Sequence, residues 1–227
     1  MKITILTLFP QVFREYFSSS IIGRAQKQGL VTIKLVNIRD FTSNKHKNVD
    51  DKSYGGGVGM IMRVDVVEKA IADVKKNQDP RYKEKVVLLD PAGKLFHQTV
   101  AKRYSTLDHL ILVCGHYEGI DSRVSHFVDE SISIGKYVLT GGEIPAMVIS
   151  DALVRLIPGV LPKKEAIIFE SYSDGKTIEY PQYTRPRTYK ELKVPTILLS
   201  GNHKKIQAWR LKQATLRSMR EEKELLK

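Results

Sequence analysis

The sequence predicts an α/β fold followed by a small, mostly helical C-terminal domain. Two apolar runs at residues 3–9 and 30–38 flank a helical pattern at residues 10–28, which is the arrangement of a βαβ unit. Short apolar runs at residues 110–113 and 132–134 have the length of buried strands. Near the end, an apolar run from residue 194 and a capping Asn202 precede a long helical pattern.

A connection of unusual length follows the βαβ unit, whose helix is ended by Gly29. Residues 39–54 (RDFTSNKHKNVDDKSY) show no periodicity, and a loop of that length in a compact domain is usually functional. It leads into the glycine cluster GGGVGM at residues 55–60. No Lys-Ser or Lys-Thr pair follows these glycines and the GxGxxG spacing is absent, so the cluster is neither a P-loop nor a dinucleotide motif.

The middle of the chain continues the alternation of helices and strands. We expect a helix at residues 64–77, a strand at 85–90, a turn at 90–93 and a helix at 98–107. A further helix should start at Gly141-Gly142-Glu143, with Pro145 in its first turn, and stop at Pro158-Gly159.

Glycine-bearing loops follow the strands expected at residues 110–113 and 132–134. Glycine lets a ligand approach the backbone without a Cβ in the way, and ligands of α/β domains bind at the carboxyl ends of strands. The turn at residues 90–93 adds a third loop at a strand end. The sequence therefore predicts a binding site made of three loops and facing a helix start.

Composition limits the kind of protein. The single cysteine, Cys114, excludes an internal disulfide and a multi-cysteine metal site, and we interpret it as a core residue. The chain has no apolar run near the ~18 residues of a membrane span and no signal peptide, so we expect a soluble, cytoplasmic protein without a membrane partner. Scattered histidines without HxxxH or HExxH spacing argue against a zinc site.

The formal net charge of +12 is concentrated near the C-terminus. Residues 201–220 hold six basic side chains and no acidic one: Lys204, Lys205, Arg210, Lys212, Arg217 and Arg220. Such a stretch either binds a polyanion or is a solvated basic helix. A glycine-rich site, a few acids, Arg123, Arg155 and a basic tail together suit group transfer onto nucleic acid from a bound small donor.

Eight strings in collinear order carry a resemblance to a known family: TLFP, RDFT, VDDKSYGGGVGM, LVCGHYEGIDSRV, SIGKYVLTGGEIPAM, RLIPGVL, YPQYTRP and LLSGNHKKIQAWRLKQ. The chain resembles the bacterial tRNA guanine-N1 methyltransferases that act at position 37. The resemblance implies S-adenosylmethionine as methyl donor, tRNA with guanosine at position 37 as substrate, and a homodimer with active sites at the subunit interface. It also implies the SPOUT fold, a parallel sheet in which the donor loops belong to a deep trefoil knot.

By the same resemblance the chain divides into a donor-binding domain at residues 1–160, a flexible linker with the catalytic acid at 161–187, and a basic tRNA-binding domain at 188–227. The expected donor contacts fall in the three loops. They are Leu88, Leu89, Asp90, Pro91, Gly115, Glu118, Gly119, Ile134, Gly135, Lys136, Tyr137, Val138, Leu139, Gly141, Gly142 and Pro145.

The resemblance also supplies the catalytic assignments. The linker acid matches Glu170, although the family pattern has Asp there, and Asp174 is the alternative base. Arg155 matches the arginine that stabilises the target base, while its structural alternative is a charge at a helix C-terminus. The family is associated with Mg²⁺, which Glu118 or Glu170 could hold through oxygen, but no metal ligands are assigned.

The residues expected to contact tRNA lie in the long loop and in the tail: His46, Asp50, Gly57, Gly59, Arg185, Asn202, His203 and Arg210. Two other functions fit the same sequence. One is a different SPOUT enzyme, such as a ribose 2′-O methyltransferase acting on RNA. The other is a noncatalytic RNA-binding protein with a nucleotide-like pocket.

Overall fold

The computed structural model describes residues 1–75, 79, 81–163 and 167–225. The chain forms two compact units, Met1–Pro162 and Lys163–Lys227, which are considered separately below. Among the described residues, no helix combines the length and the apolar character that a membrane crossing requires.

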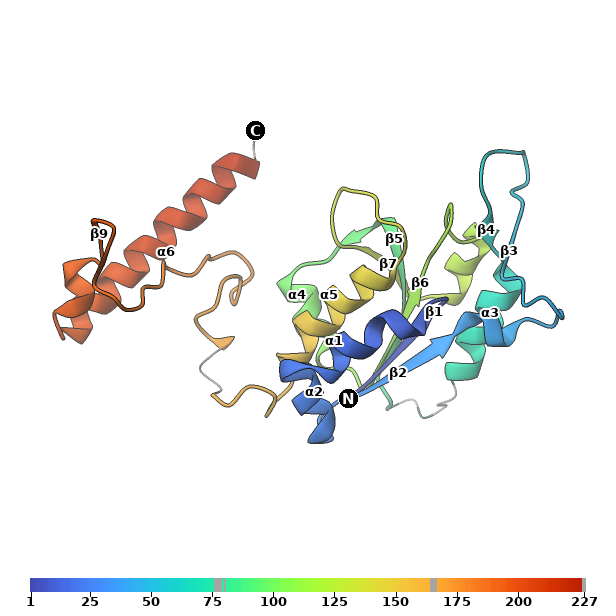
Figure 1. Ribbon diagram of the computed structural model, residues 1–227, viewed down its shortest axis with the longest axis horizontal. Helices are drawn as coiled ribbons and strands as arrows, with labels where there is room; N and C mark the ends of the chain where they lie inside the picture. Colours follow the sequence, from blue (N-terminus) through green and yellow to red (C-terminus); the bar gives the residue numbers. More distant parts are fainter. Residues whose placement is uncertain (76–78, 80, 164–166, 226–227) are drawn as a thin grey trace. The chain divides into compact units, whose positions relative to one another are not determined.

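A five-stranded, wholly parallel sheet forms the centre of the first unit (Figure 1). Its spatial order is β2-β1-β6-β5-β7. The central strand β6 is buried along its whole length, as expected for a strand covered on both faces. The strands are β1 Lys2–Thr7, β2 Thr32–Asn37, β5 Glu84–Leu95, β6 His109–Cys114 and β7 Glu130–Ser133.

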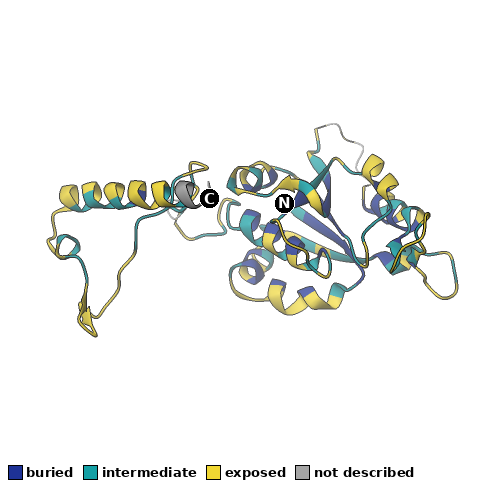
Figure 2. Ribbon diagram, turned by 90° about the horizontal axis from the view of Figure 1, so that it is seen from above, coloured by how far each residue is buried: buried dark blue, intermediate teal, exposed yellow. Residues whose placement is uncertain are grey.

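Helices cover both faces of this sheet, and each face has its own apolar core (Figures 1 and 2). Side chains of β6 alternate between the two cores: Leu110 and Leu112 contribute to one, Ile111 and Val113 to the other. The first core takes side chains from α1 Arg14–Ser18, α2 Ser20–Lys27, α4 Gln98–Tyr104 and α5 Glu143–Val154. The second takes them from α3 Val64–Val74 and the short 3₁₀ helices η2 Ile38–Phe41 and η3 Ser122–Phe127.

The prediction of a single helix at residues 10–28 was wrong. The segment consists of the 3₁₀ helix η1 Pro10–Phe13, α1 and α2, and the chain is extended at Ser19 (φ −100°, ψ 161°) between the two α-helices. The hydroxyl groups of Ser18 and Ser19 both donate to the carbonyl oxygen of Glu15, at 3.1 and 2.6 Å. Serine side chains that bond to the backbone compete with the helical ladder, which explains the break.

The turn expected at residues 90–93 is part of a longer strand. Leu89 and Lys94 both pair with Ile132 of β7, so the residues between them form a bulge, and β5 continues to Leu95. Gly93 permits the close approach, because a Cβ at this position would lie 2.5 Å from the nitrogen of Ile132. The helix predicted at 64–77 ends at Val74, and residues 76–77 lie outside the described residues.

A two-stranded antiparallel ladder carries the glycine cluster. It pairs β3 Asp50–Asp51 with β4 Ile61–Met62. The N–H of Met62 donates to the carbonyl oxygen of Gly119 (3.0 Å), and the N–H of Glu118 donates to that of Met60 (3.1 Å). The hairpin is therefore attached to the loop that follows β6.

The second unit contains one long helix, α6 His203–Leu225, with most of its surface exposed (Figure 2). Asn202 caps this helix as expected, since its Oδ1 accepts the N–H of Lys205 at 3.1 Å. A short ladder and a 3₁₀ turn precede the helix: β8 Thr188–Tyr189, β9 Leu192–Lys193 and η5 Thr196–Leu199.

Candidate active site

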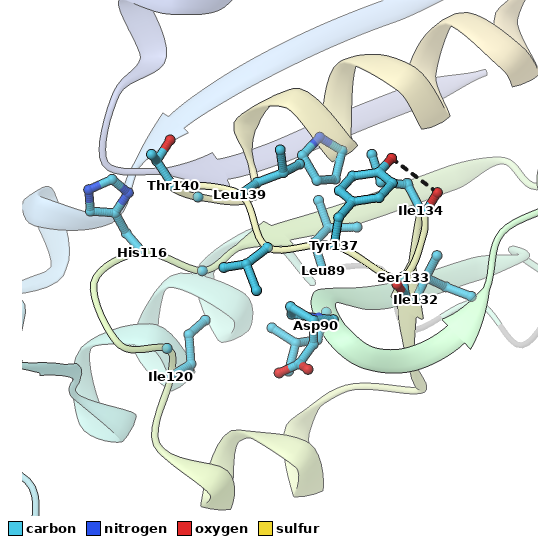
Figure 3. A pocket seen from close by; sticks show the side chains of 18 of the residues that line it. Leu89, Asp90, His116, Ile120, Ile132, Ser133, Ile134, Tyr137, Leu139 and Thr140 are labelled. Carbon is cyan, nitrogen blue, oxygen red and sulfur yellow. Dashed lines mark hydrogen bonds between the residues drawn. The ribbon is translucent and has the colours of Figure 1, made fainter.

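A cavity of about 210 Å³ lies where residues 88–91 of β5 meet the loops after β6 and β7 (Figure 3). All the residues expected to contact the donor line it except Lys136, whose side chain is exposed outside the lining. Six further residues that the sequence analysis had not assigned to the site also line the cavity: His116, Tyr117, Ile120, Ile132, Ser133 and Thr140. All but Ile132 are adjacent in sequence to a predicted residue, and this neighbourhood was the available signal.

The loops after β6 and β7 are joined backbone to backbone. The N–H of Gly142 donates to the carbonyl oxygen of Gly115 at 2.8 Å, and His116 forms a β-bridge with Gly141. A Cβ on Gly142 would lie 2.6 Å from Cα of Cys114 and 3.0 Å from the nitrogen of Gly115. A glycine is required at position 142 because the cavity floor is this contact between two backbones.

The loop from Ile134 to Gly142 forms one wall. The hydroxyl of Tyr137 donates to the carbonyl oxygen of Ile134 at 3.3 Å, shown as the dashed line in Figure 3. Ser133 donates from its hydroxyl to the carbonyl oxygen of Gly135 at 3.0 Å. Tyr137 and Val138 are nonetheless 54% and 87% exposed, so this wall presents apolar side chains to solvent. Such exposure suits a surface that a ligand or a partner covers.

The glycine-rich hairpin lies beside the same cavity. Gly59 (φ +86°) comes so close to Glu118 that a Cβ on Gly59 would overlap the carboxylate side chain. Gly57 and His46, two of the expected tRNA contacts, are exposed on this hairpin and the loop before it, and Asp50 is in β3. Of these predicted residues, Gly59 is the one shown next to a residue of the cavity lining, Glu118.

The start of α5 lies at the cavity, where Gly142 and Pro145 are part of the lining. Glu143 accepts a hydrogen bond from the Thr7 hydroxyl at 2.7 Å. Cys114, next to the floor, is 1% exposed, and burial together with the Glu143 charge raises the pKa of its thiol well above the ordinary value. The interpretation of Cys114 as a core residue is confirmed.

A second hollow of about 680 Å³ is lined by residues of the hairpin and of the segment 120–123, and it contains Arg63 and Arg123. Each guanidinium is paired with a carboxylate two residues away, Arg63 with Asp65 at 2.8 Å and Arg123 with Asp121 at 2.7 Å. Arg123, which the sequence had singled out, thus has a carboxylate partner within the chain, and this pairing raises the pKa of its guanidinium.

The two predicted catalytic residues belong to different units. Arg155 is half-buried at the C-terminal cap of α5. Glu170 is half-buried at the start of a turn at residues 170–176. In that turn Asp174 accepts hydrogen bonds from the N–H groups of Lys176 (3.0 Å) and Thr177 (2.7 Å) and from the Thr177 hydroxyl (2.5 Å). These bonds hold the pKa of Asp174 far below its usual range.

The tail residues expected to contact tRNA differ in exposure. Arg185, Asn202 and His203 are exposed, whereas Arg210 is half-buried with its guanidinium 4.8 Å above the ring centre of Tyr180. Within the part of the chain that the structure describes, no three His, Cys, Asp or Glu side chains cluster closely enough to hold a metal ion.

Comparison with known proteins gives one consistent answer. The profile of the family described as tRNA (Guanine-1)-methyltransferase TrmD matches residues 1–227. Relatives named tRNA (guanine-N(1)-)-methyltransferase occur in Carboxydothermus hydrogenoformans (52% identity, 100% of this chain, 88% of the relative) and Dictyoglomus turgidum (50%, 100% and 90%). Another, from Staphylococcus epidermidis, is 46% identical over 100% of this chain and 91% of its own length. The chain therefore belongs to the tRNA (guanine-1)-methyltransferase family.

Proposed function

We propose that this protein transfers the methyl group of S-adenosylmethionine to N1 of guanosine at position 37 of tRNA. The observation that carries the proposal is the cavity built by residues 88–91 of β5 and the loops after β6 and β7, in a chain whose residues 1–227 match the family.

The cavity suits a donor of this kind. Its floor consists of backbone that glycines leave accessible, and its walls are apolar side chains such as Leu89, Ile132 and Leu139. Backbone N–H and carbonyl groups can read the edge of an adenine, while apolar walls hold its faces. When bound, the donor supplies an electrophilic methyl group on a sulfonium.

The residues of the chain would then prepare the target base. N1 of guanine carries a proton, which must leave before its lone pair can form a bond to carbon, and we assign Glu170 as the general base. Loss of that proton moves negative charge toward O6, and the Arg155 guanidinium would stabilise it. The three hydrogen bonds at Asp174 and its lowered pKa support Glu170 over Asp174, because a carboxylate held so firmly in its charged form is a weak base.

A homodimer and a knotted SPOUT topology complete the proposal. Two observations support a knot in this region. β5 pairs in parallel with both β6 and β7, and a bridge joins the loop after β6 to the loop after β7. Val12, Tyr16, Ile144 and Val148 are large apolar or aromatic residues more than 40% exposed on η1, α1 and α5. Tyr16 donates to Asp151 of α5 at 2.5 Å, so these elements present one surface, and exposed apolar patches of this kind mark interfaces.

We propose that tRNA contacts His46 in the loop before the hairpin and the hairpin residues Asp50, Gly57 and Gly59. In the tail it would contact Arg185, Asn202, His203 and Arg210. Neutralisation of phosphates by the basic tail would supply most of the affinity. Residues 161–187 would carry the acid between the donor-binding and tRNA-binding domains. A Mg²⁺ ion would take carboxylate oxygens from Glu118 or Glu170.

The test is incubation of the protein with methyl-labelled S-adenosylmethionine and unmodified tRNA, followed by nucleoside analysis. Label on N1 of guanosine is expected. Label on a ribose oxygen would identify a different SPOUT enzyme, and donor binding without any transfer would identify a noncatalytic RNA-binding protein.

The same assay tests the base. Glu170→Ala should reduce methyl transfer by about 10²-fold or more, within the range for loss of a general base, with unchanged donor affinity. Asp174→Ala is the matched control, since it removes a carboxylate from the same turn. Full activity of Glu170→Ala with loss of activity in Asp174→Ala would transfer the role to Asp174.

A further inference from the structure

We infer that helix α6 is the element that positions the catalytic acid, through hydrogen bonds between Arg217, Ser218 and Glu221 and the segment that follows Glu170. This inference rests on the proposed role of Glu170 as the base. Arg217, Ser218 and Glu221 act as positioning residues, and they give α6 a function in addition to its positive charge.

The acid-bearing turn is closed by its own hydrogen bonds. The N–H of Tyr172 donates to the carbonyl oxygen of Thr177 at 2.6 Å, and the N–H of Ser173 donates to that of Glu170 at 3.1 Å. Asp174 bonds across the turn to Lys176 and Thr177, as described above. Ser171, next to Glu170, accepts the N–H of Glu179 at 3.0 Å. Residues 170–179 therefore form a compact loop whose parts move together.

Three contacts fix this loop to one face of α6. Ser218 accepts the N–H of Ile178 at 2.9 Å, and Arg217 donates from Nη1 to the carbonyl oxygen of Glu179 at 2.9 Å. The hydroxyl of Tyr172 donates to the carboxylate of Glu221. The bonded residues on the helix span little more than one helical turn, and those on the loop come from both of its ends.

The Ser218 hydroxyl is well suited to this task. It is half-buried and donates to the carbonyl oxygen of Ala214 at 3.0 Å, so its lone pairs are directed at the loop. Ala214 beneath it is 7% exposed. With the loop attached in this way, tRNA that contacts the basic side chains of α6 would also act on the element that holds Glu170.

The test compares Ser218→Ala and Tyr172→Phe with Thr215→Ala. Thr215 is the matched control because it lies on the same helix, and its hydroxyl likewise bonds to the carbonyl four residues earlier, at 3.1 Å from Leu211, without touching the loop. We expect kcat to fall about fivefold in Ser218→Ala and in Tyr172→Phe, and more than tenfold in the variant that combines them, as loss of one or two hydrogen bonds implies. In these variants, KM for tRNA and donor affinity should stay at wild-type values. Thr215→Ala should keep wild-type kcat, and Ser218→Thr, which keeps the hydroxyl, should have a kcat near that of wild type.

Amide hydrogen exchange separates this inference from the proposed function. In the free protein, the amides of Ile178 and Glu179 should exchange faster in Ser218→Ala than in wild type, whether or not the protein methylates tRNA. An inactive wild-type protein would refute the proposed function. An active wild type with unchanged exchange and kcat within twofold in the double variant would refute only the positioning role, as would equal losses in Thr215→Ala.

Discussion

Two alanine substitutions on the same cavity floor should separate the fold from donor binding. Gly142→Ala should destabilise the protein and weaken donor binding together. Gly115→Ala should weaken donor binding while leaving stability nearly unchanged. The two glycines are joined by one hydrogen bond and differ in what a new Cβ would meet.

The magnitudes follow from the geometry. The backbone of Gly142 (φ −80°, ψ −1°) is open to alanine, so the cost comes from overlap with Cα of Cys114 at 2.6 Å and with the nitrogen of Gly115 at 3.0 Å. Backbone atoms of a buried strand end cannot rotate away, and overpacking of this kind costs about 1–3 kcal/mol, or a Tm lower by about 2–10 °C. A Cβ on Gly115 would meet the Ile120 side chain at 3.5 Å and the Leu89 carbonyl oxygen at 3.7 Å, which are ordinary contacts.

Thermal unfolding and isothermal titration with S-adenosylmethionine measure the two effects. For Gly115→Ala we expect a Tm within about 2 °C of wild type and donor affinity at least about tenfold lower, equivalent to about 1.4 kcal/mol. Wild-type affinity in Gly115→Ala would show that the donor does not lie against this floor. A wild-type Tm in Gly142→Ala would refute the packing argument.

Three further predictions concern other parts of the first unit. Cys114, buried and with a raised thiol pKa, should react with a thiol reagent only after unfolding, and rapid modification of the native protein would contradict this. Burial lowers the pKa of His109, which contacts Glu84 at 2.7 Å, so stability should fall as pH drops below about 6.5, where the unfolded histidine takes up a proton. His109→Gln should flatten the dependence of Tm on pH between 7.5 and about 5.5, and an unchanged slope would exclude His109 as its cause. Val148→Glu should yield a monomer by light scattering if α5 forms the proposed dimer interface; an intact dimer would place that interface elsewhere.

The cavity could be predicted from the sequence because its parts follow a local rule. The loops after β6 and β7 are glycine-bearing stretches directly after short apolar strands, and parallel strands bring such stretches to one edge of a sheet. The third stretch, residues 88–91, lies within β5, overlapping the position where the sequence predicted a turn. His116 and Thr140, each adjacent in sequence to a predicted residue, were not singled out, and the bridge between His116 and Gly141 joins the two loops that carry them.

Other features depend on side-chain contacts and strand pairing that the apolar periodicity does not reveal. The break at Ser19 results from two serines that bond to one carbonyl, and the continuation of β5 past Asp90 depends on its pairing with Ile132 in β7. The pairing of Arg123 with Asp121, two residues away, was not anticipated when Arg123 was singled out. The roles of Glu170 and Arg155 came from resemblance alone, because an isolated acid and an isolated arginine have no diagnostic spacing.

The most direct test of the donor site is hydrogen–deuterium exchange of the protein with and without S-adenosylmethionine. The account predicts slower exchange in the cavity-lining stretches at residues 88–91, 115–120 and 134–142, with no change at residues 51–54, 63–65 and 121–123 of the second hollow. Protection confined to that second hollow would contradict the account. Unchanged exchange in all three cavity-lining stretches at a saturating donor concentration would contradict it as well.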